Sequence, residues 1–144
     1  MAVMTRIISV AVLALGLSLL VAFGCANQSQ KWYGQWEGDL QRVDPVDSTA
    51  RTINKAELRI KADGTFLLIR SGISEEGTHQ LGDDKAFLKV TKVLGRQIDQ
   101  IGPAAEAMNK DLVLRWQDDG TITLDDPGGF DEKPVVLKQV TGAD

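Results

Sequence analysis

Cysteine and histidine are nearly absent from this sequence, which has one of each among its 144 residues. With Cys25 as its only cysteine, the chain forms no disulfide bond within itself. A Ser–His–Asp triad needs a histidine base, and zinc sites typically need several histidine or cysteine ligands. We therefore interpret His79 as a hydrogen-bonded or exposed strand residue, and we expect no enzymatic activity, no catalytic residue, no cofactor and no metal.

Runs of basic residues are also missing. The formal net charge is −4, with 16 Lys and Arg against 20 Asp and Glu. Binding of nucleic acid requires a basic patch for the phosphates, so we expect no nucleic-acid partner. The pairs Asp83–Asp84, Asp118–Asp119 and Asp125–Asp126 do not match the spacing of a calcium loop. Carboxylates in such places are typical turn formers.

A long apolar run occurs only at the N-terminus. Arg6 precedes residues 7–23, which are almost all apolar, and no cationic cluster follows them. This pattern is typical of a signal peptide. The dipeptide Gly24–Cys25 resembles the lipobox of bacterial lipoproteins, in which a small residue precedes a cysteine that is lipidated and becomes the new N-terminus. The resemblance implies a signal peptide over residues 1–24 and lipid attachment at Cys25.

Lipid on Cys25 implies an exported chain that is anchored in the bacterial cell envelope. Ala26, and not aspartate, follows the cysteine. In Gram-negative lipoproteins this favours the outer membrane, with the domain facing the periplasm. Residues 25–31 form a short tether, and six linker residues reach at most roughly 20 Å. The alternatives are an ordinary signal peptide, an uncleaved N-terminal anchor, or a cysteine that remains a free thiol.

From residue 32 onward the sequence alternates short β patterns with turn signals. Residues 58–68 and 114–124 superpose after a shift of 56 positions, and each segment contains Asp-Gly-Thr between two strand patterns. Asp-Gly is a strong signal for a tight hairpin turn. Eight strands are expected, at residues 33–40, 58–61, 65–69, 77–81, 85–90, 112–116, 121–124 and 134–140.

Eight antiparallel strands in a meander can close into a barrel that is filled by side chains or holds one small ligand. We therefore predict an all-β domain over residues 32–141, with a two-sheet β-sandwich as the alternative fold. Residues 95–110 interrupt the β pattern. Pro103 at the start of an alanine-rich stretch favours a short helix near residues 103–109.

The opening Gly34-Gln35-Trp36 carries a resemblance to a known family. Together with Gly77-Thr78-His79 and the two Asp-Gly-Thr hairpins, it resembles the small bacterial lipocalin-like domains, compact meander barrels found in secreted lipoproteins. The resemblance covers most of residues 33–140. It implies that Trp36 packs across the closed end of the barrel. It implies no single activity, because a fold does not fix a function.

The expected function is the non-catalytic binding of a small apolar ligand by a membrane-anchored barrel. The candidate ligand pocket consists of Leu58, Ile60, Phe66 and Trp116, and the candidate lid consists of Ile98, Ile101 and Met108. The alternative is a structural or protein–protein interaction lipoprotein of the envelope that has no small-molecule ligand. An interior with no room for a ligand would favour this alternative.

Overall fold

The computed structural model describes residues 29–40, 54–102, 111–126 and 133–141. The chain divides into two units, residues 1–31 and residues 32–144, and every strand belongs to the second unit. The strands are β1 (Gly34–Asp39), β2 (Lys55–Ile60), β3 (Thr65–Arg70), β4 (Ile73–Leu81), β5 (Lys85–Val93), β6 (Arg96–Gln97), β7 (Asp111–Trp116), β8 (Ile122–Asp125) and β9 (Val135–Gln139). Two short 3-10 helices are also present, η1 (Ser29–Trp32) and η2 (Ile98–Gln100).

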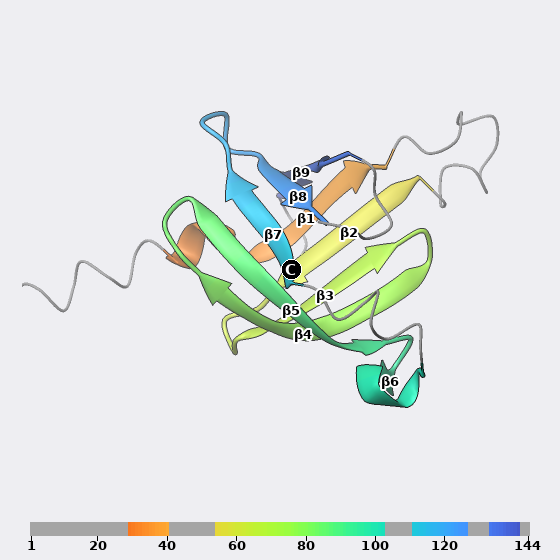
Figure 1. Cartoon of the computed structure of the whole chain (residues 1–144). Helices are drawn as coiled ribbons and strands as arrows, with labels where there is room; N and C mark the ends of the chain where they lie inside the picture. The colour runs from red at the N-terminus through yellow and green to blue at the C-terminus, as the bar shows by residue number, and fades with distance from the viewer. Residues whose placement is uncertain (1–28, 41–53, 103–110, 127–132, 142–144) are drawn as a thin grey trace, which may run out of the picture. The chain divides into compact units, whose positions relative to one another are not determined.

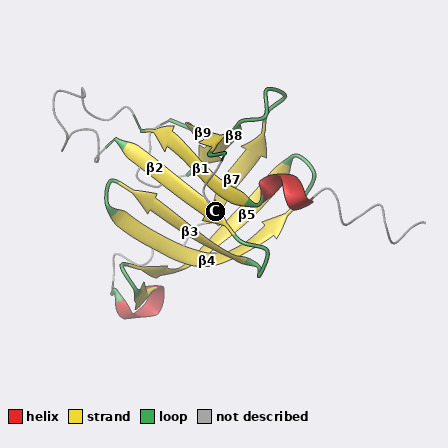
Figure 2. Cartoon of the chain, turned by 180° about the vertical axis from the view of Figure 1, so that it is seen from behind, coloured by secondary structure: helices red, strands yellow, loops and turns green. Residues whose placement is uncertain are grey.

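The second unit is an antiparallel barrel. Its sheet has the order β4-β3-β2-β1-β9-β8-β7-β5-β6, and a further pairing of β4 with β5 closes it (Figure 1). Eight strands form the closed barrel, and the two-residue β6 is appended to β5. The predicted all-β meander is confirmed, and the alternative of two separate sheets is not what the chain forms. Figure 2 shows the same barrel from behind.

The barrel wall follows the alternation of the sequence. On β2, Ala56, Leu58 and Ile60 point inward and are fully or almost fully buried, while the residues between them face outward. Successive side chains of a strand point to opposite faces, so one apolar residue in two suffices to fill the interior. The described core consists of Trp32, Trp36, Ala56, Leu58, Ile60, Phe66, Leu68, Ala86, Leu88, Val90, Val93, Leu112, Leu114, Ile122, Leu124, Val135 and Leu137.

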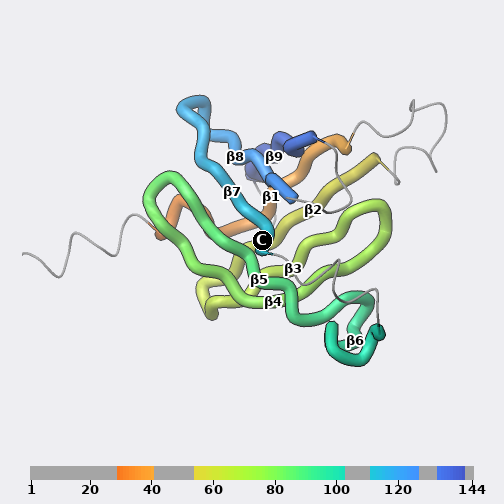
Figure 3. The backbone as a smooth tube through the Cα atoms, in the orientation of Figure 1, coloured from red at the N-terminus to blue at the C-terminus, as the bar shows by residue number. Residues whose placement is uncertain are grey.

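The predicted helix near 103–109 lies outside the described residues, but the start of the interruption is described. Gly95 has a φ of 75°, and β6 and η2 follow it. This segment continues from the end of β5 and lies beside it (Figure 3). The sequence did not indicate β6 or η2, because two- and three-residue elements leave no periodic pattern.

The two Asp-Gly-Thr turns are the same structure. In each, the aspartate Oδ1 accepts hydrogen bonds from the threonine backbone N–H and hydroxyl group. The hydroxyl distances are 2.6 Å for Thr65 to Asp63 and for Thr121 to Asp119. The intervening glycines have φ angles of 88° and 80°, which side chains rarely tolerate. The repeat seen in the sequence is thus a repeat of turn geometry.

Loss of the threonine hydroxyl is expected to raise the pKa of the aspartate. The hydroxyl and backbone hydrogen bonds of Thr65 hold the pKa of Asp63 below its ordinary value of 3.8. In the Thr65→Val variant we expect this pKa to move back toward 3.8, while the pKa of Asp119 stays low as an internal control. An NMR titration of the carboxyl carbons measures both.

The sign of the pH effect follows from the lowered pKa. A carboxylate with a lowered pKa in the folded state stabilises the fold above its unfolded pKa, and the contribution is lost as pH falls through the folded pKa. The wild-type chain should therefore lose more stability than Thr65→Val on acidification below about pH 4. Equal loss in the two chains would contradict this role of the hydroxyl group.

Candidate functional site

Three buried charged residues form the candidate site. They are Arg70 at the end of β3, Glu75 on β4 and Asp126, which directly follows β8. Their exposed fractions are 4%, 3% and 8%. Buried charges are rare unless they are paired, because the loss of water is costly for an ion. We call these three residues the charged cluster.

The sequence places Arg70 inside the barrel by simple alternation. Phe66 and Leu68 precede it at intervals of two on β3, and both are buried in the core. Arg70 has the same parity and so points to the same face. A two-residue turn then leads into β4, where Glu75 is also buried. The β3–β4 hairpin thus brings the guanidinium and the first carboxylate together.

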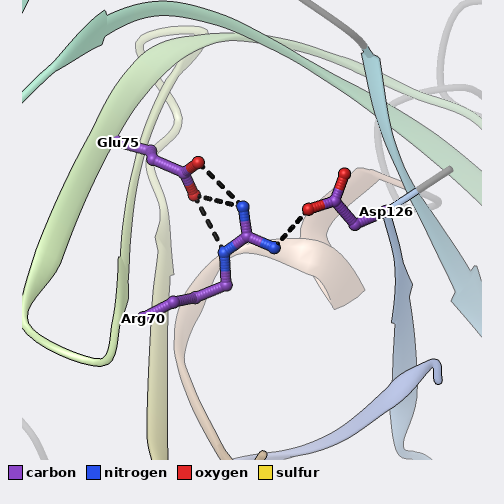
Figure 4. Close-up of polar contacts among 3 residues, drawn as sticks. All are labelled: Arg70, Glu75 and Asp126. Atoms are coloured by element: carbon purple, nitrogen blue, oxygen red, sulfur yellow. Dashed lines mark hydrogen bonds and ion pairs between the residues drawn. The ribbon is translucent and has the colours of Figure 1, made fainter. Parts of the chain in front are cut away.

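The contacts within the cluster use three nitrogens of the guanidinium (Figure 4). Arg70 Nε donates to Glu75 Oε2 at 3.0 Å, and Nη2 donates to Glu75 Oε1 at 2.8 Å. On the other side, Nη1 donates to Asp126 Oδ2 at 2.6 Å. Two parallel bonds from a planar guanidinium to one carboxylate are the strongest form of this interaction. Glu75 is therefore the partner that fixes the orientation of Arg70.

The contact between Arg70 and Asp126 spans the barrel. In the closed order of strands, β3 and β8 are four positions apart among eight, so they lie on opposite walls. The bond between Nη1 and Asp126 Oδ2 therefore crosses the interior near one end (Figure 4). Any molecule that enters the interior from this end meets the charged cluster first.

The guanidinium stays charged in spite of its burial. Burial by itself lowers the pKa of Arg70, but the hydrogen bonds and charges of Glu75 and Asp126 outweigh this and raise the pKa above its ordinary value. The cluster is consequently a fixed arrangement of one cation and its two carboxylate partners. It can orient a polar group by charge and hydrogen bonding, and it offers no nucleophile.

The opposite end of the barrel is closed by tryptophans. Trp32 and Trp36 are fully buried, and both contact the partly buried Trp116 edge-on, with ring centroids 5.4 and 5.8 Å apart. Trp32 Nε1 donates to the carbonyl oxygen of Gly82, and Trp36 Nε1 donates to that of Trp32. Trp36 therefore packs where the resemblance implied. We call this the tryptophan end.

The candidate pocket residues lie in the packed interior. Leu58, Ile60 and Phe66 belong to the core, with exposed fractions of 0–2%. Leu58 is at the middle of β2, opposite Leu68. Ile60 and Phe66 lie at the tryptophan end of β2 and β3, and Trp116 is itself one of the three tryptophans there. The structure thus groups these residues inside the barrel, and the binding of a ligand among them stays a prediction.

The candidate lid is described only in part. Ile98 and Ile101 are partly buried and pack against the core, while Met108 lies outside the described residues. Cys25, the expected lipid attachment site, lies outside them as well. His79 is a strand residue whose Nε2 lies 2.8 Å from the carbonyl oxygen of Lys61, so it is hydrogen-bonded as interpreted.

The described segments give no sign of a metal centre. Among them, no group of three or more histidine, cysteine, aspartate or glutamate side chains is arranged to hold a metal ion. In the same part of the chain, no helix has the length and apolar composition needed to cross a membrane.

Sequence reasoning missed the charged cluster, although a signal for it was present. The strand predicted over residues 65–69 stops one residue before Arg70, and Asp126 is interpreted there as a turn former. The structure corrects both predictions, because Arg70 belongs to β3 and pairs with Asp126 inside the barrel. Arg70 and Asp126 are separated by 56 positions. This equals the shift that superposes the two Asp-Gly-Thr hairpins, so an extension of that superposition by two residues aligns them.

Comparison with known proteins identifies no relative: no family model, no curated protein and no solved structure matches the chain significantly.

Proposed function

We propose that the chain is a non-catalytic lipoprotein of a bacterial cell envelope, held by lipid on Cys25, whose lipocalin-like barrel binds a small, mainly apolar ligand. The charged cluster carries this proposal. Ligand sites are mostly apolar with a few well-placed polar groups, and they occur in the mouths of β-barrels. Arg70, Glu75 and Asp126 supply such groups at one end of an apolar interior.

The energetics of the charged cluster support a role in recognition. Well-packed apolar residues of similar volume often match or exceed a buried ion pair in stability. A barrel that served only as a compact scaffold would gain little from a guanidinium in its interior. The same group is useful for orienting the polar part of a ligand whose apolar part contacts residues such as Leu58. Because the tryptophan end is closed, the ligand enters past the charged cluster.

A second candidate function is favoured by the contacts at the two ends of the barrel. The tryptophans fill one end of the interior, and the contact between Arg70 and Asp126 crosses the other. Both features fit a barrel whose interior holds side chains alone. In that case the chain is an envelope protein that acts through contacts with other proteins and has no small-molecule ligand.

Mass spectrometry of the protein purified from its native envelope tests both parts of the proposal. Under denaturing conditions, we expect the mass of residues 25–144 plus a diacylglycerol, and we expect the Cys25→Ser variant to lack this addition. Under native conditions in detergent, we expect a further non-covalent mass of a few hundred daltons, on the scale of one ligand in a small barrel.

The two readouts fail separately. An unmodified Cys25 would overturn the lipid anchor and leave the ligand untouched. A bare native mass, both as purified and after incubation with a total lipid extract, would overturn ligand binding. It would favour the second candidate function, an envelope protein that contacts other proteins.

A further inference from the structure

The outer wall formed by β5 and β7 carries three cations around an exposed aromatic ring. On β5, Lys85, Phe87 and Lys89 alternate with buried residues and so face outward. On β7, Arg115 lies directly opposite Lys85, and Val113 lies directly opposite Phe87. We call these five residues the β5–β7 face.

The side chains of this face are available at the surface. Phe87 is 40% exposed, one of three large apolar side chains in the described part of the chain with such exposure. Lys85 Nζ lies 4.9 Å from the centre of its ring, a cation–π contact. Lys85, Lys89 and Arg115 are exposed, and none of them forms an ion pair with another described residue. Asp111 lies directly opposite Lys89, so the positive charge without an acidic residue opposite it is that of Lys85 and Arg115.

The opposite wall has a different character. In the closed order of strands, β1 and β2 lie across the barrel from β5 and β7. There, Lys55 pairs with both Glu37 and Glu57 at 3.3 and 2.8 Å, and Arg59 donates to Gln35. Lys55 is thus matched by two carboxylates, and Arg59 is hydrogen-bonded to a neutral amide. The barrel therefore presents unpaired positive charge on one side within a chain whose net charge is −4.

The β5–β7 face also lies beside the point where the chain enters the barrel. Trp32 Nε1 donates to the carbonyl oxygen of Gly82, and the backbone N–H of Gly82 donates to the carbonyl oxygen of Lys85. Lys85 and Arg115 thus lie at the tryptophan end of their strands. Asp111 lies opposite Lys89 and Asp125 lies opposite Val113, so the acidic residues of β7 and β8 border the face on the side away from Lys85 and Arg115.

We propose that the β5–β7 face rests on an anionic phospholipid surface and orients the barrel there. Two properties favour a bilayer as the partner. Cations attract anionic headgroups, at about 1 kcal/mol for each lysine or arginine near the surface. An exposed phenylalanine can bury its apolar ring at the boundary between headgroups and acyl chains. The inference rests in part on the proposed lipid anchor, because a short tether from Cys25 to Trp32 keeps this end of the barrel near the membrane. Beyond the anchor, the inference states which side of the barrel faces the membrane, and that the lipid bound there is anionic.

Vesicle binding tests the face without the lipid anchor. Residues 32–144 form one unit, and the described core lies entirely within it, so the chain from Ala26 onward is expected to fold by itself. A cooperative thermal transition checks this before binding is measured. We expect this chain to co-sediment with phosphatidylcholine vesicles that contain phosphatidylglycerol, and to bind pure phosphatidylcholine vesicles much more weakly.

A matched pair of variants locates the contact. The double variant Lys85→Ala with Arg115→Ala should bind the anionic vesicles about 25-fold more weakly, since about 1 kcal/mol for each cation is a factor of about five. The double variant Lys55→Ala with Arg59→Ala changes the charge equally on the opposite wall and should bind within about twofold of the parent. Phe87→Ala should weaken the binding that remains at high salt.

Two outcomes overturn the proposal. One is equal binding to vesicles with and without phosphatidylglycerol, or no binding to either. The other is an equal loss in the two double variants, which would indicate attraction without a defined face. Because Cys25 is absent from this chain, these outcomes are independent of the lipid anchor, which the denatured mass tests separately.

Discussion

Replacement of Arg70 by methionine is expected to lower the free energy of unfolding by about 3–5 kcal/mol. The variant removes the shared partner of Glu75 and Asp126, and both carboxylates are then buried without the guanidinium. Urea unfolding followed by far-UV circular dichroism measures the loss. Arg59→Met is the matched control, because Arg59 is exposed on β2, and its loss should stay within about 0.5 kcal/mol.

One further measurement separates charge from packing. A triple variant, Arg70→Met with Glu75→Leu and Asp126→Leu, removes every charge of the cluster and should recover most of the lost stability. If Arg70→Met were as stable as Arg59→Met, the ion pairs of the charged cluster would make no contribution to the free energy of unfolding.

Replacement of Gly77 by alanine is expected to lower the free energy of unfolding by about 3 kcal/mol or more. Gly77 lies at a register shift between β4 and β5, beneath the ring of Phe66. A Cβ atom there would overlap the carbonyl oxygen of Lys89 and would lie 2.9 Å from Phe66 Cε1. The carbonyl belongs to the backbone of β5, so neither strand can yield without breaking the β4–β5 pairing that closes the barrel.

Gln80→Ala is the control for Gly77→Ala. Gln80 is exposed on the same strand, and its replacement should change stability by no more than about 1 kcal/mol. Thermal unfolding of the two variants compares them directly. Similar transitions would show that β4 and β5 separate at Gly77 with little loss of stability. Steric overlap with the backbone of β5 would then not explain the glycine at this position.

Local patterns predicted much of the barrel wall. Alternation and the Asp-Gly turns located β2, β3, β7 and β8, because a strand with one buried face must alternate and a tight turn needs glycine at a positive φ. The expected bounds differ from the observed ones mainly at the charged end. There β2 begins at Lys55 and β4 at Ile73, earlier than predicted, and β5 continues to Val93. Those positions include charged or polar residues that a search for apolar alternation does not detect.

The candidate site was less predictable, for a physical reason. Glu75 and Asp126 are residue types that are ordinarily exposed, and pairing with Arg70 makes their burial tolerable. Pairing across a barrel depends on closure of the sheet, which no local pattern reports. Trp36 shows the contrast: the Gly34-Gln35-Trp36 resemblance already implied that it packs inside the barrel, and it is fully buried.

The pairing of β1 with β9 has a consequence for the order of events during folding. The backbone N–H of Val140 donates to the carbonyl oxygen of Gln35, and Gln139 lies opposite Trp36. Because a chain is synthesised from its N-terminus, β1 can pair with β2 early, but its other edge stays unpaired until β9 has been made. Until then the sheet has two open edges, which readily pair with other chains. A chain truncated before β9 is therefore expected to form an open, aggregation-prone sheet instead of the barrel.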